Sequence, residues 1–183
     1  MKRYKFLKEG FKSNNGNCVW EIGKWKKHKG KLEMCKSGFH CSKKIYQAFF
    51  YVQGEILAEI EARGKKLAEK DKEVYSEMRI LRAWKWQKKD SVELAIYCAE
   101  LCLKNFEKVY PNDKRPRIAI ESTKLWLKGK ISEKELFAAE SAAWSAAESA
   151  AGSARSAEWS AGSAVIDKMA NWMDKRLKIL ETI

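Results

Sequence analysis

The spacing of hydrophobic residues changes near residue 90. Before it, hydrophobic and polar positions alternate over short stretches, which is typical of half-buried strands. After it, hydrophobic residues recur every three or four positions, which is typical of amphipathic helices. We therefore expect an α+β protein, with a small mixed strand and helix domain over residues 1–88 and a helical domain over residues 89–183.

The first domain is predicted to contain five strands and one helix in the order β-β-β-α-β-β. Ser42 is placed to cap the helix, which continues to about Val52 and is ended by Gly54. The period-two pattern is clearest where Ile56, Ala58 and neighbouring apolar residues share one side of a strand. The expected strands cover residues 3–7, 18–22, 31–35, 55–62 and 77–84.

The second domain is predicted to be entirely helical. Asp90 and Glu93 form a capping box for its first helix, and Ser132 and Glu135 form one for its third. A loop with two prolines separates the first helix from the second, and Gly129 closes the second. The first two helices are expected at residues 91–109 and 117–128, and the last amphipathic segment at 165–183.

Residues 138–164 consist mainly of Ala, Ser and Gly. Serines from Ser141 to Ser163 and alanines from Ala142 to Ala164 recur at steps of three and four, so a helix here has two ridges of small residues. Such ridges allow another helix to approach closely, but Ala buries too little area to hold a helix alone. We expect a long helix that self-associates through residues 138–164, with Trp144 and Trp159 locking the contact.

The positive charge of the chain lies in its first half. Residues 1–89 contain 23 Lys and Arg against 10 Asp and Glu, whereas residues 90–183 contain 14 of each. A half-chain with this excess attracts anionic partners through a long-range field that salt weakens. The expected partner is therefore an acidic protein such as a host defence protein, a nucleotide signal or a nucleic acid.

Other features of composition narrow the class of protein. No apolar run has the length of a membrane span, and the start MKRYKFLKEG lacks the apolar stretch of a signal peptide. The five cysteines are odd in number and widely spaced, which favours reduced thiols. We expect a cytoplasmic protein without a membrane partner or a cofactor.

Aromatic and basic residues alternate between Trp20 and Lys31, a pattern suited to holding a phosphate beside a stacked base. The alternative is a solvated hairpin tip with one buried tryptophan.

Arg115 and Arg117 lie at a helix start, where free N–H groups bind anions or are simply capped. Alternating charges between Glu61 and Arg82 also suit cross-strand ion pairs. The candidate ligand-binding residues are Trp20, Lys24, Trp25, Lys26, Lys27, Lys29, His40, Lys43, Arg79, Arg82, Arg115 and Arg117.

Two further kinds of chemistry involve His40. By ligand type, Cys35, His40 and Cys41 with Cys18 or His28 suit a tetrahedral zinc site, although their spacing fits no standard motif and a buried structural role is the alternative. Gly-Phe-His before a helix, followed by a strand with Glu59 and Glu61, also resembles small ADP-ribosyltransferase folds. The full catalytic set is absent, and we expect His40 to be a hydrogen-bonded structural residue.

Several phrases in the first half resemble a domain of unknown function common in phage and prophage proteins. They are Tyr4-Lys-Phe, Glu33-Met-Cys-Lys-Ser-Gly-Phe-His-Cys, Ile56-Leu-Ala-Glu-Ile-Glu-Ala-Arg-Gly and Met78-Arg-Ile-Leu-Arg. The resemblance covers about residues 1–86, with Met34 where Leu is usual. It implies a phage or mobile-element setting and no established activity.

The second half resembles a helical module called an immunity protein in bacterial annotations. The resemblance is carried by Asp113-Lys-Arg-Pro-Arg, by Ala119-Ile-Glu-Ser-Thr-Lys-Leu-Trp-Leu and by the alanine-rich run, which lacks the histidines often found in such modules. Together the halves indicate a non-catalytic accessory phage protein that counteracts host defence, by inhibiting a component or sequestering its nucleotide signal. The alternatives are an ADP-ribosyltransferase-like enzyme using His40 and a strand glutamate, and a nucleic-acid-binding protein.

Overall fold

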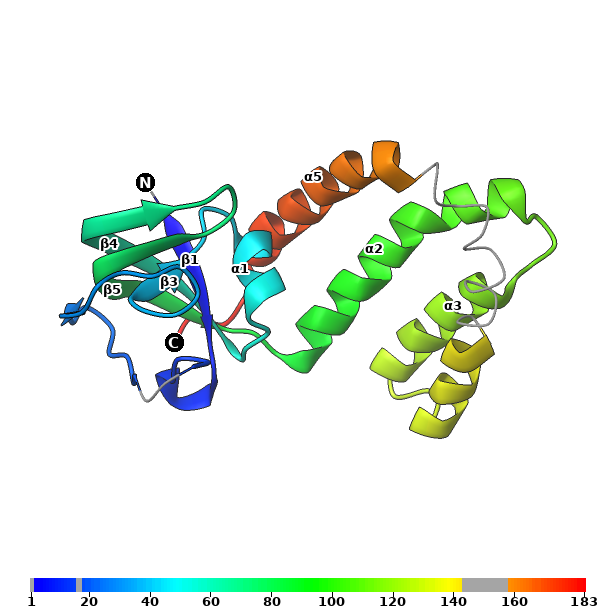
Figure 1. Ribbon diagram of the computed structural model, residues 1–183. Helices are drawn as coiled ribbons and strands as arrows, with labels where there is room; N and C mark the ends of the chain where they lie inside the picture. The colour runs from blue at the N-terminus through cyan, green and yellow to red at the C-terminus, as the bar shows by residue number, and fades with distance from the viewer. Residues whose placement is uncertain (1, 16–17, 143–157) are drawn as a thin grey trace. The chain divides into compact units, whose positions relative to one another are not determined.

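The computed structural model describes residues 2–15, 18–142 and 158–183, with the backbone alone for residues 158–163. Its contacts divide the chain into two units, Met1–Lys88 with Ala170–Ile183, and Lys89–Met169. An antiparallel sheet and a set of helices confirm the predicted α+β class (Figure 1). The elements are β1 (Arg3–Leu7), the 3-10 turn η1 (Glu9–Phe11), β2 (Lys26–Lys27), β3 (Phe39–Cys41), α1 (Ile45–Tyr51), β4 (Ile56–Ala68), β5 (Glu73–Lys85), α2 (Lys88–Val109), α3 (Arg115–Leu127) and α5 (Glu158–Arg176).

The sheet of the first unit is built around the long β4–β5 hairpin. β1 pairs with the outer edge of β4, so that Leu7 faces Ile56 and Lys5 faces Ala58. The other edge of β5 is covered by four short pieces of chain in succession. These are β3 opposite Glu73 to Tyr75, β2 opposite Glu77 and Met78, Ile22 opposite Ile80, and Thr182 opposite Trp84.

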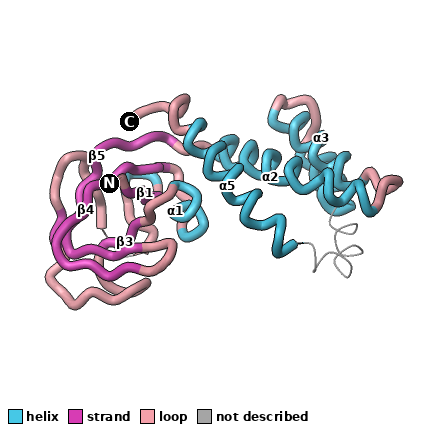
Figure 2. The backbone as a smooth tube through the Cα atoms, turned by 90° about the horizontal axis from the view of Figure 1, so that it is seen from above, coloured by secondary structure: helices cyan, strands magenta, loops and turns pink. Residues whose placement is uncertain are grey.

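Backbone hydrogen bonds close this sheet into a small barrel. Directly after β3, Ser42 exchanges two hydrogen bonds with Tyr4 of β1, at 2.8 and 3.0 Å. The circuit β1–β4–β5–β3 therefore returns to β1, and the strands curve around a common interior (Figure 2). Because side chains alternate along a strand, Leu7 joins the interior with Met78 and Ile80, whereas Phe6 packs outside against Phe49 of α1 with ring centroids 5.4 Å apart.

Two of the five predicted strands are wrong. Residues 18–22 make only single bridges, at Val19 and Ile22, because Gly23 turns the chain with a φ of 81°. Residues 31–35 form a turn in which the Ser37 N–H donates to the Glu33 carbonyl at 2.9 Å, with Cys35 at a φ of 63°. Both stretches were too short for their pattern to distinguish a strand from a loop that buries alternate side chains.

Several helix ends also differ from the prediction. α1 begins at Ile45 rather than after Ser42, because the backbone of Ser42 is hydrogen-bonded to Tyr4. The start of the helix is capped by Gln47, whose side chain accepts a hydrogen bond from the Lys44 N–H at 3.2 Å. α2 begins at Lys88, which places Asp90 inside its first turn. The predicted final helix ends at Arg176. Beyond it the Lys85 N–H donates to the Glu181 carbonyl at 2.9 Å, so the last residues extend the sheet.

In the second unit, α2 and α3 run antiparallel. Glu107 near the end of α2 pairs with Arg117 near the start of α3, and Glu100, earlier in α2, pairs with Lys124, later in α3. The helix at residues 133–142 begins with the predicted capping box of Ser132 and Glu135. Most of the predicted self-association segment, residues 143–157 of 138–164, lies outside the described residues. Within the described parts of the chain, none of the helices combines the length and apolar character needed to cross a membrane.

Candidate functional site

A ladder of ion pairs covers the outer face of the β4–β5 hairpin. Glu59 pairs with Arg82 at 2.8 Å, Glu61 with Arg79 at 2.6 Å, and Arg63 with Glu77 at 2.9 Å, each across the two strands. The predicted cross-strand ion pairs are thus confirmed. They engage Arg79 and Arg82, two of the candidate ligand-binding residues. The pairs of Glu61 and Glu77 are partly exposed and add little stability, whereas the Glu59 side chain is only 5% exposed.

Trp25 lies on this ladder. The guanidinium carbons of Arg63 and Arg79 lie 3.9 and 4.9 Å from the centre of its ring. The neighbouring Lys27 reaches Glu77 at 3.6 Å. The arginines therefore occupy ring surface that a nucleic-acid base would need for stacking.

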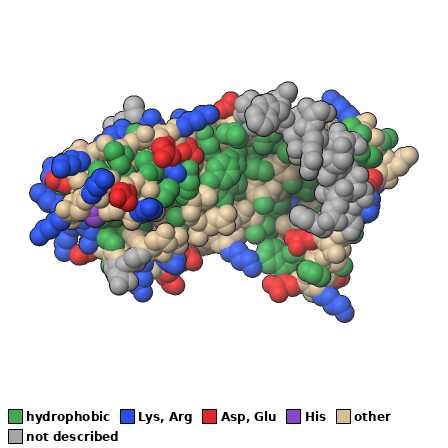
Figure 3. Space-filling model, viewed as in Figure 1, with side chains coloured by type: hydrophobic (Ala, Val, Ile, Leu, Met, Phe, Trp, Pro, Cys, Tyr) green, Lys and Arg blue, Asp and Glu red, His purple; other side chains and the backbone are tan. Residues whose placement is uncertain are grey.

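Exposed lysines surround the ladder. Ser76 brings two segments together, because its carbonyl accepts the His28 N–H at 2.8 Å and its hydroxyl accepts the Lys65 N–H at 2.9 Å. Among the described residues no carboxylate lies within ion-pair distance of Lys29 or Lys65. Figure 3 shows Lys and Arg side chains gathered over the strand-rich unit. We call the surface of Trp25, Lys27, Lys29, Arg63, Lys65 and Arg79 the basic face.

The other candidate binding residues lie elsewhere or are already engaged. Trp20 is 2% exposed and its indole N–H donates to the Ser13 hydroxyl at 2.9 Å, so neither face of its ring is open to a ligand. Lys24 is paired with Glu21, and Lys43 lies 3.8 Å from the carboxylate of Glu73. Lys26 stands opposite Met78 in the sheet.

In the second unit, both arginines of the predicted anion grip have carboxylate partners. The guanidinium of Arg115 makes three hydrogen bonds to Asp113, the shortest of 2.6 Å, and Arg117 forms a fork with Glu107 at 2.6 and 2.7 Å. These pairs lower the pKa of both carboxyl groups. A chelated guanidinium must give up this partner before it can bind another anion.

His40 supports a turn. Its Nε2 atom accepts the N–H of Cys35 at 2.8 Å, which fixes Nε2 in its unprotonated form and holds Cys35 in its left-handed conformation. Burial, and then the nearby Lys5, lower the pKa of His40 and favour the neutral ring. The expected structural role of His40 therefore has a physical basis in the contacts of the turn.

The residues of the transferase and zinc alternatives are separated in the fold. His40 stands opposite Val74, whereas Glu61 pairs with Arg79, five positions or roughly 17 Å farther along β5. In the part of the chain that the structure describes, no three His, Cys, Asp or Glu side chains gather as a metal ion requires. The geometry thus supports neither chemistry.

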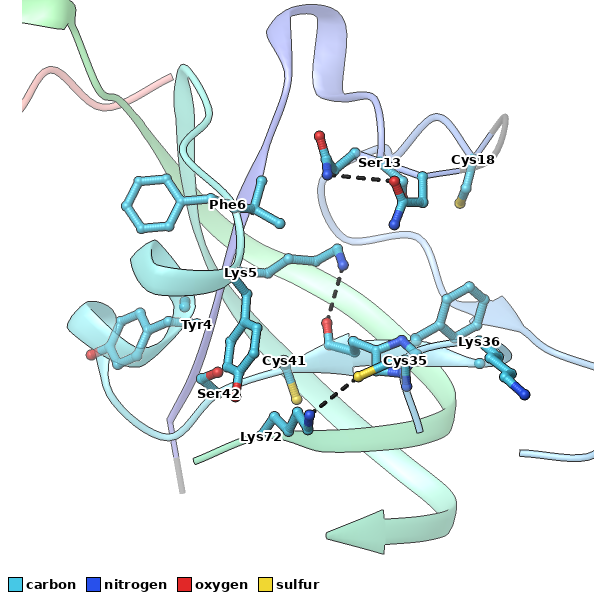
Figure 4. Close-up of a pocket in the computed structure, with 18 residues that line it drawn as sticks. Tyr4, Lys5, Phe6, Ser13, Cys18, Cys35, Lys36, Cys41, Ser42 and Lys72 are labelled. Atoms are coloured by element: carbon cyan, nitrogen blue, oxygen red, sulfur yellow. Dashed lines mark hydrogen bonds between the residues drawn. The ribbon is translucent and has the colours of Figure 1, made fainter. Parts of the chain in front are cut away.

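A cavity of about 300 Å³ opens beside β1 in the same unit. Its walls come from β1, from the loops around Ser13 and Cys35, from β3 and from α1 (Figure 4). Lys5 crosses the middle of it and donates to the His40 carbonyl at 3.1 Å. Lys5 is not among the site residues predicted from the sequence. Its one signal there is the alternation of Arg3, Lys5 and Leu7 along a strand, which does not tell which side of the strand faces inward.

The rim of this cavity carries a lysine–cysteine contact. The ammonium of Lys72 lies 3.2 Å from the sulfur of Cys35 and 3.1 Å from the carboxylate of Glu69. Tyr51 lies beside it, with its ring centre 5.2 Å from the same ammonium and its hydroxyl donating to Asp71 at 2.6 Å. The rim is thus held in place by polar contacts while the cavity behind it stays open.

Comparison with family models accounts for nearly the whole chain. Residues 1–90 match the model named "Domain of unknown function (DUF7666)", and residues 82–171 match "Imm-5 like putative immunity protein". Each match covers just under half of the chain, so the first half is similar to DUF7666 domains and the second half to Imm-5-like proteins. We use the names DUF7666 domain and Imm-5-like domain below for these two matched regions. Both resemblances inferred from sequence motifs are thereby confirmed. Comparison with curated proteins and with solved structures found no match.

The DUF7666 domain contains both the basic face and the cavity. Its match ends at residue 90, whereas Thr182 pairs with Trp84 inside its sheet. The Imm-5-like match ends at residue 171. The tail that completes the sheet therefore lies outside both matched regions.

Proposed function

We propose that this chain is a phage-type accessory protein that counteracts a bacterial defence component, and that the basic face binds an acidic surface of that component. The pairing of a DUF7666 domain with an Imm-5-like domain supports an accessory role. The phage setting comes from the motifs of the first half, and the partner's chemistry comes from the charge of the DUF7666 domain.

The uncompensated lysines of the basic face carry the proposal. Cross-strand carboxylates neutralise the arginines of the ladder, but Lys29 and Lys65 project beside it without such partners among the described residues. Exposed cations without a carboxylate partner in their own chain retain their full attraction for an incoming anionic surface. The face therefore combines a centre of paired charges with unpaired charges at its margin.

The engagement of Trp25 favours a protein partner over a nucleic acid. Binding of single strands relies on aromatic rings whose faces are open to bases. At the basic face, two guanidinium groups lie over the ring of Trp25, and Trp20 is buried. The groups that remain available to a partner are the charged lysine side chains, and these can pair with carboxylates on the surface of a folded protein.

The test is plaque formation by phages on bacteria that carry a defence system active against them, with and without expression of this chain. We expect expression to restore plaques against at least one system of a broad panel. The K29Q/K65Q variant removes the two unpaired charges and should lose most of this effect, because rim charges accelerate association. The matched control is K128Q/K130Q, which removes two exposed lysines after α3.

Three results would contradict the proposal. One is the absence of plaque restoration with every system of the panel. Another is equal restoration by K29Q/K65Q and by the unaltered chain. The third is tighter, strongly salt-dependent binding of a labelled single-stranded DNA oligonucleotide than of a labelled poly-glutamate peptide, which would favour the nucleic-acid alternative.

A further inference from the structure

Lys5 is a half-buried residue that lines the cavity. It lies on β1 between Arg3 and Leu7, on the side of the strand that faces the core, and its backbone stands opposite the fully buried Ala58. Cys18 and Cys41 are close enough to its ammonium to interact with it electrostatically. Lysine is among the residues least often buried, and a buried lysine normally has an ionic partner.

No such partner is present among the described residues. The Lys5 ammonium has three N–H donors, and its one hydrogen bond is to the His40 carbonyl at 3.1 Å. The cavity lining contains no Asp or Glu. Burial raises the pKa of the Cys41 thiol to about 12, so this neighbour is neutral and cannot act as the counter-ion. Burial also lowers the pKa of Lys5 itself, as expected for a cation without compensation.

The cavity has room and chemistry for a ligand beside this amine. At about 300 Å³ it lies at the small end of the range for ligand pockets. Phe39 gives it an aromatic wall, Tyr51 lies at its rim, and Lys36 and Lys72 place further positive charge at its edge. Figure 4 shows Lys5 between Cys18 on one side and Cys35, Cys41 and Lys72 on the other.

We propose that this cavity binds a small anion, a carboxylate or phosphate on a compact apolar body, whose acidic group pairs with Lys5 while its body lies against Phe39. The anion supplies the counter-ion that the cavity lining lacks. The aromatic wall then selects for a ring or a short branched chain over a bare inorganic ion. This site is distinct from the basic face and does not depend on the proposed defence role.

The test follows the ε-CH₂ NMR signal of Lys5 in the full-length protein during titration with benzoate, phenyl phosphate, inorganic phosphate and the neutral benzyl alcohol. We expect benzoate or phenyl phosphate to shift this signal with a Kd on the order of millimolar, as befits a fragment. Inorganic phosphate should bind more weakly, because it lacks the apolar body. A preference between benzoate and phenyl phosphate assigns the acid as a carboxylate or a phosphate.

The variant Lys5→Met keeps the length of the side chain and removes its charge. We expect it to weaken binding about 10-fold or more, since a charge-assisted hydrogen bond is lost. The control Lys8→Met, at an exposed site directly after β1, should bind as the unaltered protein does.

The melting temperature separates a ligand-binding role from a structural one. Removal of an uncompensated, half-buried charge should leave the melting temperature of Lys5→Met unchanged or raised. A lower melting temperature with unchanged binding would show that Lys5 is structural and would overturn the proposal. So would failure of all three anions to shift the Lys5 signal in the unaltered protein, a result that does not depend on the variant's folding.

Discussion

Glu73 at the start of β5 is a buried carboxylate that several cations of the DUF7666 domain surround. Its side chain is fully buried and is bonded by Arg3, by the ammonium of Lys66 at 2.7 Å and by the Tyr75 hydroxyl at 3.1 Å. The variant Glu73→Gln keeps the shape of the side chain and removes the negative charge. It removes the carboxylate that pairs with Arg3, whose side chain is 11% exposed.

The pKa of Glu73 gives the size of the expected effect. Burial alone would raise it, but the hydrogen bonds from Lys66, Arg3 and Tyr75 outweigh burial and lower it from 4.5 to about 2. A lowering of this size corresponds to about 3 kcal/mol in favour of the folded, ionised state. Solvent around the ammonium groups of Lys43 and Lys66, which are 46% and 39% exposed, reduces the expected cost of Glu73→Gln to about 2 kcal/mol.

The effect has a defined pH dependence. Because the pKa of Glu73 is lower in the folded state, its stabilisation is complete above about pH 4.5 and is lost as the pH falls toward 2. Urea unfolding, followed by the amide NMR signals of β1 and β4, measures the free energy of unfolding of this domain. The difference between Glu73→Gln and the unaltered protein should be about 2 kcal/mol at pH 7 and should close toward pH 2.

The matched control is Glu61→Gln. Glu61 is bonded by Arg79 in the exposed ladder and its side chain is 45% exposed, so we expect a cost within about 0.5 kcal/mol at any pH. A Glu73→Gln cost no larger than that of Glu61→Gln would refute the reasoning. A gap that stays constant between pH 7 and pH 2 would also refute it, because the loss would then come from packing and not from ionisation.

Two further predictions concern the backbone around the sheet. Gly54→Ala would place a Cβ atom 2.3 Å from the carbonyl oxygen of Leu7 in β1, so urea unfolding should show a loss of about 2 kcal/mol, and a loss below about 0.5 kcal/mol would contradict the close approach. Deletion of residues 177–183 should speed hydrogen exchange at the Lys85 amide, which donates to Glu181, but not at the Trp86 amide, which donates to Glu55 at 2.8 Å. Unchanged protection of Lys85 would show that the tail does not cover this edge.

The sequence was most informative where a pattern extended over many residues. The alternation in β4 and β5 predicted both strands, and the alternating charges predicted the ladder of ion pairs, because a regular antiparallel pair places such residues opposite one another. The structure extends the two strands to 13 residues each, past the point where hydrophobic alternation stops. Beyond Ala62 the hairpin is polar on its exposed sides, and pairing between the strands replaces burial as the reason for the extended conformation.

The sequence was least informative where the conformation depends on distant partners. The second edge of β5 is covered by four pieces from residues 22, 26–27, 39–41 and 182, none of which carries a strand pattern of useful length. The tail at Thr182 continued a helical pattern in the sequence, yet the open edge of β5 beside Trp84 offers it backbone partners. Tertiary pairing of this kind overrides local preference.

The positive charge of the first half, which the sequence treats as one quantity, separates in the structure into three environments. Arg63, Arg79 and Arg82 are neutralised on the ladder, and Arg3 is neutralised in the interior by Glu73. Lys29 and Lys65 lie on the surface, where water stabilises an unpaired cation and leaves it available for long-range attraction. Lys5 is half-buried at a cavity whose lining contains no Asp or Glu. An unpaired cation costs little in water but much in a barrel interior, so the two proposals rest on different physics, and one can fail without the other.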